Sequence, residues 1–232
     1  MCGRYSLAWD TEALARHFAV TVAMPTLTPR YNIAPQQQAP IVFDDSEGGE
    51  RRVALFRWGL VPFWADDPSI GNRMVNARGE SVAVKPAYRA AARCRRCLVP
   101  AGGFYEWREV GGKKQPFYFV PRGERPIAFA GLYERWEGDA GEVVDSYTVI
   151  TTDANATLAP IHDRMPVIVE PANYDRWLDP ETRNVEDVRD LLRPAPDDLL
   201  EARAVSRRVN RPTEDDAQLI EPIETQGSLF GA

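Results

Sequence analysis

The sequence predicts an α+β fold in which antiparallel sheets predominate. Short apolar, β-branched or aromatic runs recur along the chain, and most are separated by turns or short loops. Helical periodicity is confined to a few short stretches between these runs. Because strands joined by short loops pair in antiparallel fashion, this order favours antiparallel sheets over a doubly wound parallel fold.

The first element expected is a short helix. Asp10 precedes apolar residues at helical spacing, so it is expected to cap a helix that runs to about Phe18. Residues 24–40 contain four prolines and are expected to form an extended loop, because proline removes a backbone donor that a helix needs.

The remaining elements follow from the same patterns. Two strand-like runs flank an acidic, glycine-containing turn and predict a β-hairpin with strands at 40–43 and 52–58. Further strands are expected at 97–100, 117–120, 127–133, 147–151 and 166–169. Helical patterns occupy 86–92, 171–178 and 185–193.

Residues 1–222 are expected to form a single domain. The chain has 232 residues, enough for one large domain or two small ones, and neither a repeat nor a linker divides it. Residues 223–232 follow Pro222 and lack periodicity, so they are expected to form a flexible tail.

Composition and charge argue against several classes of protein. With 44% hydrophobic and 27% charged residues, the chain lies in the globular range. No apolar run reaches the roughly 18 residues of a membrane-spanning helix, so no membrane partner is expected. A secretory signal is also absent from the sequence, which indicates a cytoplasmic location. The net charge of −6 argues against a protein that coats nucleic acid with its whole surface.

Basic residues are nevertheless concentrated in two segments that contain no acidic residue. This segregation permits one local basic face, although Arg207 and Arg208 have the alternative of being ordinary surface charges. The segments are 85–98, with Lys85, Arg89, Arg93, Arg95 and Arg96, and 202–212, with Arg203, Arg207, Arg208 and Arg211.

Cys2 is a candidate nucleophile because of its position. Once Met1 is removed, the chain begins with an amine and a thiol on adjacent carbons. Their unperturbed pKa values, about 7.7–8.0 and about 8.5, leave both partly nucleophilic at neutral pH. Such a pair suits an aldehyde, since the amine forms an imine and the thiolate then closes a thiazolidine ring. The alternative is an arbitrary residue at a frayed end.

Two other segments offer groups for proton transfer. Glu106 lies between aromatic residues after the glycine pair at 102–103, and such surroundings raise the pKa of a carboxyl group. A buried Glu106 without a catalytic role is the alternative. His162 lies in a polar loop before Pro166, which favours proton transfer over core packing. By contrast, His17 is expected to be structural.

The cysteines give little support for a metal site. Cys94 and Cys97 have the spacing of a zinc half-site, but no second pair follows and the chain has two histidines. We therefore interpret both cysteines as structural and expect neither a metal nor another cofactor.

Six segments together resemble the SOS-response-associated peptidase family, known for processing abasic sites. They occur in family order, and the similarity covers nearly residues 2–222. The resemblance implies a barrel-like core of twisted, mainly antiparallel sheets with flanking helices. The segments are Met1-Cys2-Gly3-Arg4, Tyr31-Asn32-Ile33-Ala34-Pro35, Arg57-Trp58-Gly59-Leu60-Val61-Pro62 with Trp64, Asn76-Ala77-Arg78-Gly79-Glu80, Gly103-Phe104-Tyr105-Glu106-Trp107 and Ile161-His162-Asp163-Arg164-Met165-Pro166.

The resemblance also implies a reaction. Cys2 would capture the ring-opened aldehyde of an abasic site in single-stranded DNA and shield the lesion during the SOS response. By similarity, Asn76 positions the Cys2 terminus, Glu106 acts as general acid and base, and His162 shuttles protons. A peptidase activity that removes the N-terminal residue and a lyase side activity belong to the same expectation.

The DNA contacts implied by the resemblance are of two kinds. Single-stranded DNA is usually held by phosphate contacts together with aromatic stacking. Core or edge packing is the alternative for the two tryptophans. The expected contacts are Arg4, Arg78 and Arg164 to phosphates, and Asn32, Trp58 and Trp64 along the strand path.

The end of the chain carries a separate motif. Residues 226–230, Gln-Gly-Ser-Leu-Phe, are similar to the peptide with which bacterial proteins bind the replicative sliding clamp. Gln226 and the apolar anchors Leu229 and Phe230 stand in otherwise polar sequence, which fits docking of a peptide into a groove. A chance match is the alternative for so short a motif.

Two other functions stay open. One is a peptidase or amidase with Cys2 as nucleophile and His162 as base. The other is a module that binds single-stranded DNA without chemistry.

Overall fold

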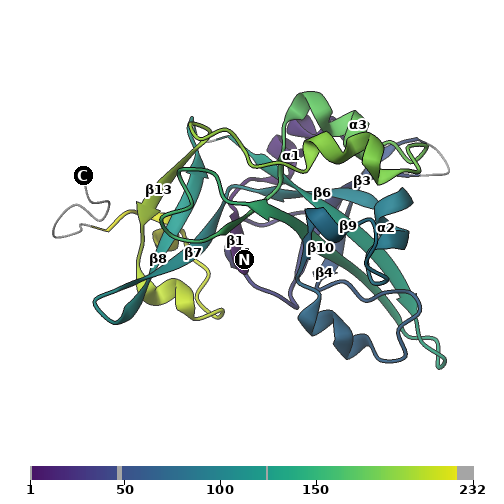
Figure 1. The fold of residues 1–232 in the computed structure, drawn as a ribbon, viewed down its shortest axis with the longest axis horizontal. Helices are drawn as coiled ribbons and strands as arrows, with labels where there is room; N and C mark the ends of the chain where they lie inside the picture. The colour runs from purple at the N-terminus through teal and green to yellow at the C-terminus, as the bar shows by residue number, and fades with distance from the viewer. Residues whose placement is uncertain (1, 46–48, 124, 224–232) are drawn as a thin grey trace.

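The computed structural model describes residues 2–45, 49–123 and 125–223, and shows two β-structures that meet at the N-terminal strand (Figure 1). The first is an antiparallel sheet of five strands, seen at the left of Figure 1. Its strands, in spatial order, are β13 (Leu200–Ala204), β8 (Lys113–Pro121), β7 (Gly103–Val110), β1 (Tyr5–Leu7) and β2 (Arg30–Ile33).

The second β-structure is a closed barrel of five strands. The barrel closes because β9 pairs with both β6 and β10. Its strands, in order around the barrel, are β10 (Val143–Asp153), β4 (Arg51–Trp58), β3 (Gln38–Asp44), β6 (Arg96–Ala101) and β9 (Ile127–Glu137). The predicted α+β class with a barrel-like antiparallel core is thus confirmed.

Three short strands extend the barrel, and two pairings depart from the antiparallel rule. β5 (Asn76–Arg78) and β11 (Arg164–Pro166) pair with β10, and β12 (Ile168–Val169) pairs with β9. β10 runs parallel to both β4 and β5. These parallel pairs join segments far apart in sequence, which the pattern of successive short strands does not reveal.

Several predicted elements are present with their expected local chemistry. The helix α1 (Thr11–His17) is capped by Asp10, whose carboxylate accepts a hydrogen bond from the amide of Ala13 at 2.8 Å. The predicted hairpin is formed by β3 and β4, in antiparallel register. The loop expected over 24–40 instead contains β2 and the start of β3, and the amides of Tyr31 and Asn32 in β2 donate to the carboxylate of Asp215.

Helices are few and short. The segment expected as a helix over 185–193 forms 3₁₀ turns instead and ends at Leu191, shortly before Pro194. Among the described residues, no helix has the length and apolar character needed to cross a membrane. Besides α1, the helices are α2 (Arg89–Cys94), α3 (Tyr174–Leu178), and the 3₁₀ turns η1 (Pro68–Arg73), η2 (Gly79–Ser81), η3 (Pro171–Asn173), η4 (Val185–Leu191), η5 (Arg207–Asn210) and η6 (Ala217–Ile220).

Tyr5 joins the sheet to the barrel. Its ring packs edge-on against Trp58 and Phe129, with centroids 5.1 and 5.8 Å away. Its hydroxyl lies 2.8 Å from that of Tyr147, inside the core. The strand β1 is therefore fixed between the two β-structures.

A single guanidinium holds together the elements that cover one side of the barrel. Arg96, at the start of β6, is 3% exposed and lies 5.7 Å over the ring of Trp177. Burial lowers its pKa, but its donors are satisfied by backbone carbonyls rather than by carboxylates. The accepting carbonyls belong to Ala92, Arg93, Trp177, Asp179 and Thr182.

We expect Arg96→Ala to lower the free energy of unfolding by about 3–5 kcal/mol, since several buried carbonyls lose their donor. Urea unfolding measures the effect. Arg16→Ala is the control, because the side chain of Arg16 forms an exposed ion pair with Glu12 and, among the described residues, no other ion pair, so its loss should cost about 0.5 kcal/mol or less. Equal effects of the two substitutions would contradict the role assigned to Arg96.

Candidate functional site

Cys2 and Glu106 are brought together by the pairing of β1 with β7. Tyr5 lies opposite Phe104, and the pairing continues toward the N-terminus because the amide of Tyr105 donates to the carbonyl of Arg4 at 2.9 Å. Glu106, the next residue of β7, therefore lies beside the segment that carries Cys2. Both side chains are inside the protein, with Cys2 0% and Glu106 3% exposed.

Asn76 reaches the same place from the barrel. The parallel pairing of β5 with β10 sets Asn76 beside Val149. Its Nδ2 donates to the backbone carbonyl of Cys2 at 2.8 Å. Its Oδ1 is buried and accepts no hydrogen bond within the described ranges. This oxygen can therefore accept a hydrogen bond from a donor group of a ligand. Tyr88 supports the strand, since its hydroxyl donates to the carbonyl of Asn76 at 3.2 Å.

The electrostatics of the site suit proton transfer near neutral pH. Burial raises the pKa of Glu106 from its ordinary 4.5 to about 7, and the nearby charge of Asp163 acts in the same direction. Burial, reinforced by the Glu106 carboxylate, also raises the pKa of the Cys2 thiol. At neutral pH the thiol therefore keeps its proton, whereas Glu106 is present in both its acid and its base form.

His162 lies in the loop between β10 and β11. Its Nδ1 is 3.0 Å from the amide nitrogen of Arg164 and 2.9 Å from a carboxylate oxygen of Asp163. Burial lowers the pKa of the ring. Because the amide is a fixed donor while the Asp163 side chain is 87% exposed, the geometry favours a neutral ring that accepts at Nδ1 and carries its proton on Nε2.

Two of the predicted DNA contacts lie on the surface. Arg78 is exposed at the end of β5, and Trp64 is 48% exposed in the loop after β4. Phe63 beside it is 55% exposed and is not among the contacts predicted from the sequence. The sequence feature that could have identified Phe63 is the aromatic pair Phe63-Trp64 directly after Pro62.

Arg164 is anchored to acidic residues. Its Nη1 lies 2.7 Å from carboxylate oxygens of both Glu80 and Asp153, and its Nη2 donates to the carbonyl of Thr151. These contacts tie β11 and η2 to the end of β10. A phosphate near Arg164 would have to exchange with one of these carboxylates.

The other three predicted contacts are buried or half-buried, and each is already hydrogen-bonded within the protein. Arg4 donates to the side-chain oxygen of Asn32 and to the carbonyl of Val209, each at 2.7 Å. Asn32 is 0% exposed and binds the backbone carbonyls of the 209–214 segment. Trp58 is also 0% exposed, and its indole N–H donates to the carbonyl of Val75. Trp58 therefore packs in the core, which was the alternative to DNA binding. No base can stack on it without opening the core.

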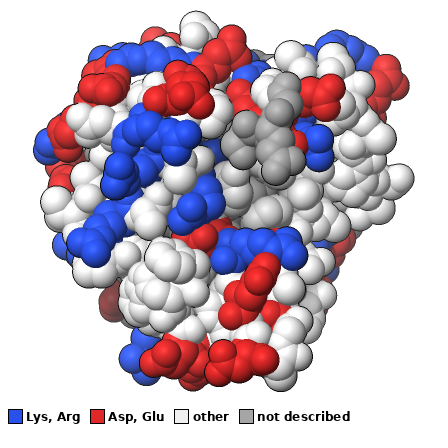
Figure 2. Space-filling model, turned by 90° about the vertical axis from the view of Figure 1, so that its right-hand side faces the viewer, with Lys and Arg blue, Asp and Glu red and all other residues white. Residues whose placement is uncertain are grey.

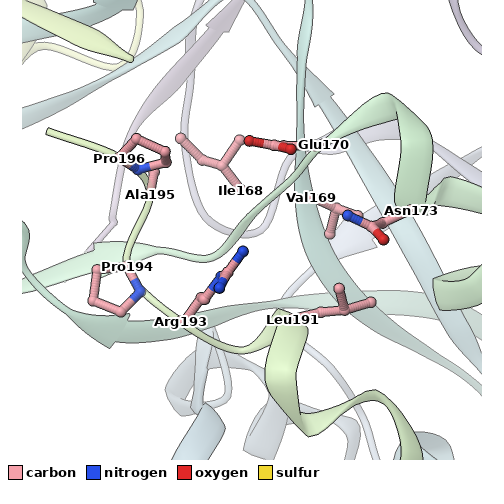
Figure 3. A pocket seen from close by; sticks show the side chains of 9 residues that line it. All are labelled: Ile168, Val169, Glu170, Asn173, Leu191, Arg193, Pro194, Ala195 and Pro196. Carbon is pink, nitrogen blue, oxygen red and sulfur yellow. The ribbon is translucent and has the colours of Figure 1, made fainter. Parts of the chain in front are cut away.

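The remaining predicted features lie apart from this cluster. Cys94 ends α2 and Cys97 is buried in β6, both with free thiols. The hollow in Figure 3 is lined by β12 and the 191–196 segment and contains none of the predicted site residues. The tail motif at Gln226, Leu229 and Phe230 lies outside the described residues.

The raised pKa of Glu106 predicts a pH-dependent effect of Glu106→Gln on stability. Well below about pH 4.5, Glu106 is protonated in both the folded and the unfolded protein, so its burial does not lower the free energy of unfolding. Above about pH 7 it is charged in both, and the folded protein must keep that charge buried. The wild type should therefore lose up to roughly 3 kcal/mol of unfolding free energy relative to the variant between pH 4 and pH 8. Urea unfolding at several pH values, with the exposed Glu109→Gln as control, measures this. A pH-independent difference would contradict the assignment.

Comparison with known proteins places the fold and these motifs in one family. Residues 1–212 match the SOS response associated peptidase (SRAP) family. The abasic site processing protein YoqW of Bacillus subtilis is 38% identical over 224 residues, covering 95% of this chain and 99% of YoqW. The abasic site processing protein HMCES of Xenopus tropicalis is 34% identical over 195 residues, covering 72% of this chain and 58% of HMCES.

Solved structures agree with the sequence matches. A crystal structure of a Bacteroides thetaiotaomicron protein has a TM-score of 0.86 and 26% identity, covering 96% of this chain and 100% of that one. A Bordetella bronchiseptica protein has a TM-score of 0.74 and 29% identity, covering 88% of this chain and 100% of that one. The chain belongs to the SRAP family.

Proposed function

We propose that this protein processes abasic sites in single-stranded DNA by forming a thiazolidine crosslink between Cys2 and the aldehyde of the opened sugar. The crosslink would shield the lesion in the DNA-damage (SOS) response. The observation that carries the proposal is the convergence of Cys2, Asn76 and Glu106, with the Asn76 amide 2.8 Å from the Cys2 carbonyl oxygen. The relatives named above as abasic site processing proteins support the same substrate.

The first step forms an imine. It requires a free α-amine on Cys2, so Met1 must be removed beforehand. The amine nitrogen adds to the aldehyde carbon, and the resulting hydroxyl leaves as water with a proton from Glu106. Because Glu106 has a pKa of about 7, a substantial fraction carries that proton at neutral pH. The burial of Cys2 limits the return of water to the imine.

The second step closes the ring. The sulfur bonds to the former aldehyde carbon, and the thiol proton passes to the Glu106 carboxylate left by the first step. The electron pair of the C=N bond returns to the protonated imine nitrogen, which keeps its N–H, so water is the only product released. A thiol whose pKa is raised by burial needs such a base. The same carboxyl group thus acts as acid in the first step and as base in the second.

Asn76 and His162 have supporting roles in this scheme. Asn76 holds the Cys2 backbone, and its buried Oδ1 would accept a hydrogen bond from a sugar hydroxyl. His162, neutral and accepting at Nδ1, would exchange protons through Nε2.

Arg78 and Trp64 would contact the incoming strand because both are exposed. A lyase side activity would start from the imine, from which β-elimination cleaves a strand.

Intact mass of the protein with an oligonucleotide that contains one abasic site tests the chemistry. We expect wild type without Met1 to gain the mass of the oligonucleotide less one water. Cys2→Ala should give no stable adduct yet be trapped by borohydride, because its amine still forms the imine. Cys94→Ala, the matched control, should react as wild type does.

Other outcomes of this measurement separate the alternatives. A processed wild type that binds the oligonucleotide without an adduct would reject the crosslinking reaction and favour a binding module. Peptide cleavage that Cys2→Ala abolishes, again without an adduct, would favour the peptidase.

We also propose that the tail docks to the replicative sliding clamp and so brings the protein to the nucleoid. Leu229→Ala with Phe230→Ala should abolish binding to the purified clamp in a pull-down, because both anchors of the peptide are lost. Crosslinking in solution should stay at the wild-type rate, and Ile223→Ala should bind the clamp normally. Unchanged clamp binding by the double variant would contradict docking through Leu229 and Phe230.

A further inference from the structure

A basic hollow lies between α2 and the segment that leads into η4. Figure 2 shows basic side chains gathered on the face of the molecule at the right of Figure 1, where α2 lies. The hollow measures about 270 Å³ and contains no acidic side chain in its lining. Its lining residues are Ala83, Arg89, Arg93, Arg183, Asn184 and Val185.

The positive charge of this hollow is poorly compensated. Arg89 and Arg93 are exposed and lie four residues apart on one face of α2, where like charges repel. Neither forms an ion pair with any residue of the described ranges. The nearest carboxylate to Arg183 is that of Glu181, at 3.8 Å, and both side chains are exposed. By contrast, the neighbouring Arg95 is neutralised by Glu134 at 2.7 Å.

The walls of the hollow are fixed relative to each other. The buried Arg96 donates to the carbonyl of Arg93 on one wall and to that of Thr182, next to Arg183, on the other. The backbones that carry the arginines are therefore held in place before a ligand arrives. Guanidinium groups suit phosphate because two of their N–H groups can contact two oxygens at once.

The hollow is connected to the candidate site through Tyr88. This residue precedes α2 and donates to the carbonyl of Asn76, which in turn holds Cys2. The exposed Arg78 ends β5, and the exposed Lys85 lies between β5 and α2 along the chain. Arg89 directly follows Tyr88, and Arg93 lies one helical turn further along α2.

We infer that this hollow binds backbone phosphates of single-stranded DNA beyond the nucleotide that reacts with Cys2. The inference rests on the proposed function for the path of the strand. It adds a second anchoring point that extends the contact along the DNA and carries no base specificity, since phosphates carry no sequence information.

The test compares Arg89→Ala/Arg93→Ala with the control Arg16→Ala/Arg122→Ala, which removes the same charge elsewhere. Fluorescence anisotropy measures binding of undamaged single strands of about 5 and about 16 nucleotides. We expect the first variant to bind the longer strand roughly tenfold more weakly at 0.1 M salt, with the salt slope smaller by about 1.4 for two lost phosphate contacts. The short strand should bind all proteins alike, and thermal unfolding checks the fold.

Two results would overturn the inference: unchanged affinity for the longer strand, or an equal loss for both lengths, which would place the arginines at the reacting nucleotide. Crosslinking to a short abasic strand is measured in parallel. If wild type fails to crosslink while the double variant weakens binding of the longer strand, the proposed chemistry fails and the phosphate site stands. If wild type crosslinks and the double variant binds the longer strand normally, the proposed chemistry stands and the phosphate site fails.

Discussion

The packing of Tyr5 against the barrel determines where the N-terminal residues lie. Its hydroxyl meets that of Tyr147, and its ring is enclosed by Trp58 and Phe129. With one edge of β1 paired to β7, the same placement brings Cys2 beside Glu106. The barrel strand that holds Tyr147 also pairs with β5, and so supplies Asn76. One buried aromatic contact thus sets the relative positions of the three groups.

The partly or fully buried arginines differ in physical role from the two that line the hollow on α2. The buried Arg96 donates to backbone carbonyls, and the half-buried Arg4 donates to the Asn32 side chain and the carbonyl of Val209, so both organise loops. Arg164 is held by two carboxylates. In such settings a guanidinium acts as a cross-link between segments, because its five donors can reach several acceptors at once. Arg89 and Arg93 have no such partners in the part of the chain that the structure describes, which leaves their charge available at the surface.

Local chemistry could be predicted from the sequence, but long-range pairing could not. The Asp10 cap and the β3–β4 hairpin depend on neighbouring residues, and both are present. The parallel β5–β10 pair joins segments about 70 residues apart, which no local pattern encodes. Burial was equally inaccessible: Trp58 and Trp64 stand in one motif, yet one is enclosed by the barrel and the other is half-exposed. The basic segment 85–98 permits a basic face, but its Arg96 is buried, because a sequence does not show which side of a strand faces inward.

The distance in sequence between Tyr5 and Tyr147 has a consequence for the order of folding. The two residues are 142 positions apart, and Arg4 and Val209 are 205 apart. Contacts of such long range form slowly, because a large loop must close before they contribute stability. Arg4 and Tyr5 therefore reach their final place only after the segments that carry Val209 and Tyr147 have been made. Until most of the chain has been made, the amine and thiol of Cys2 have no enclosure, and a fragment that stops before β10 cannot assemble one.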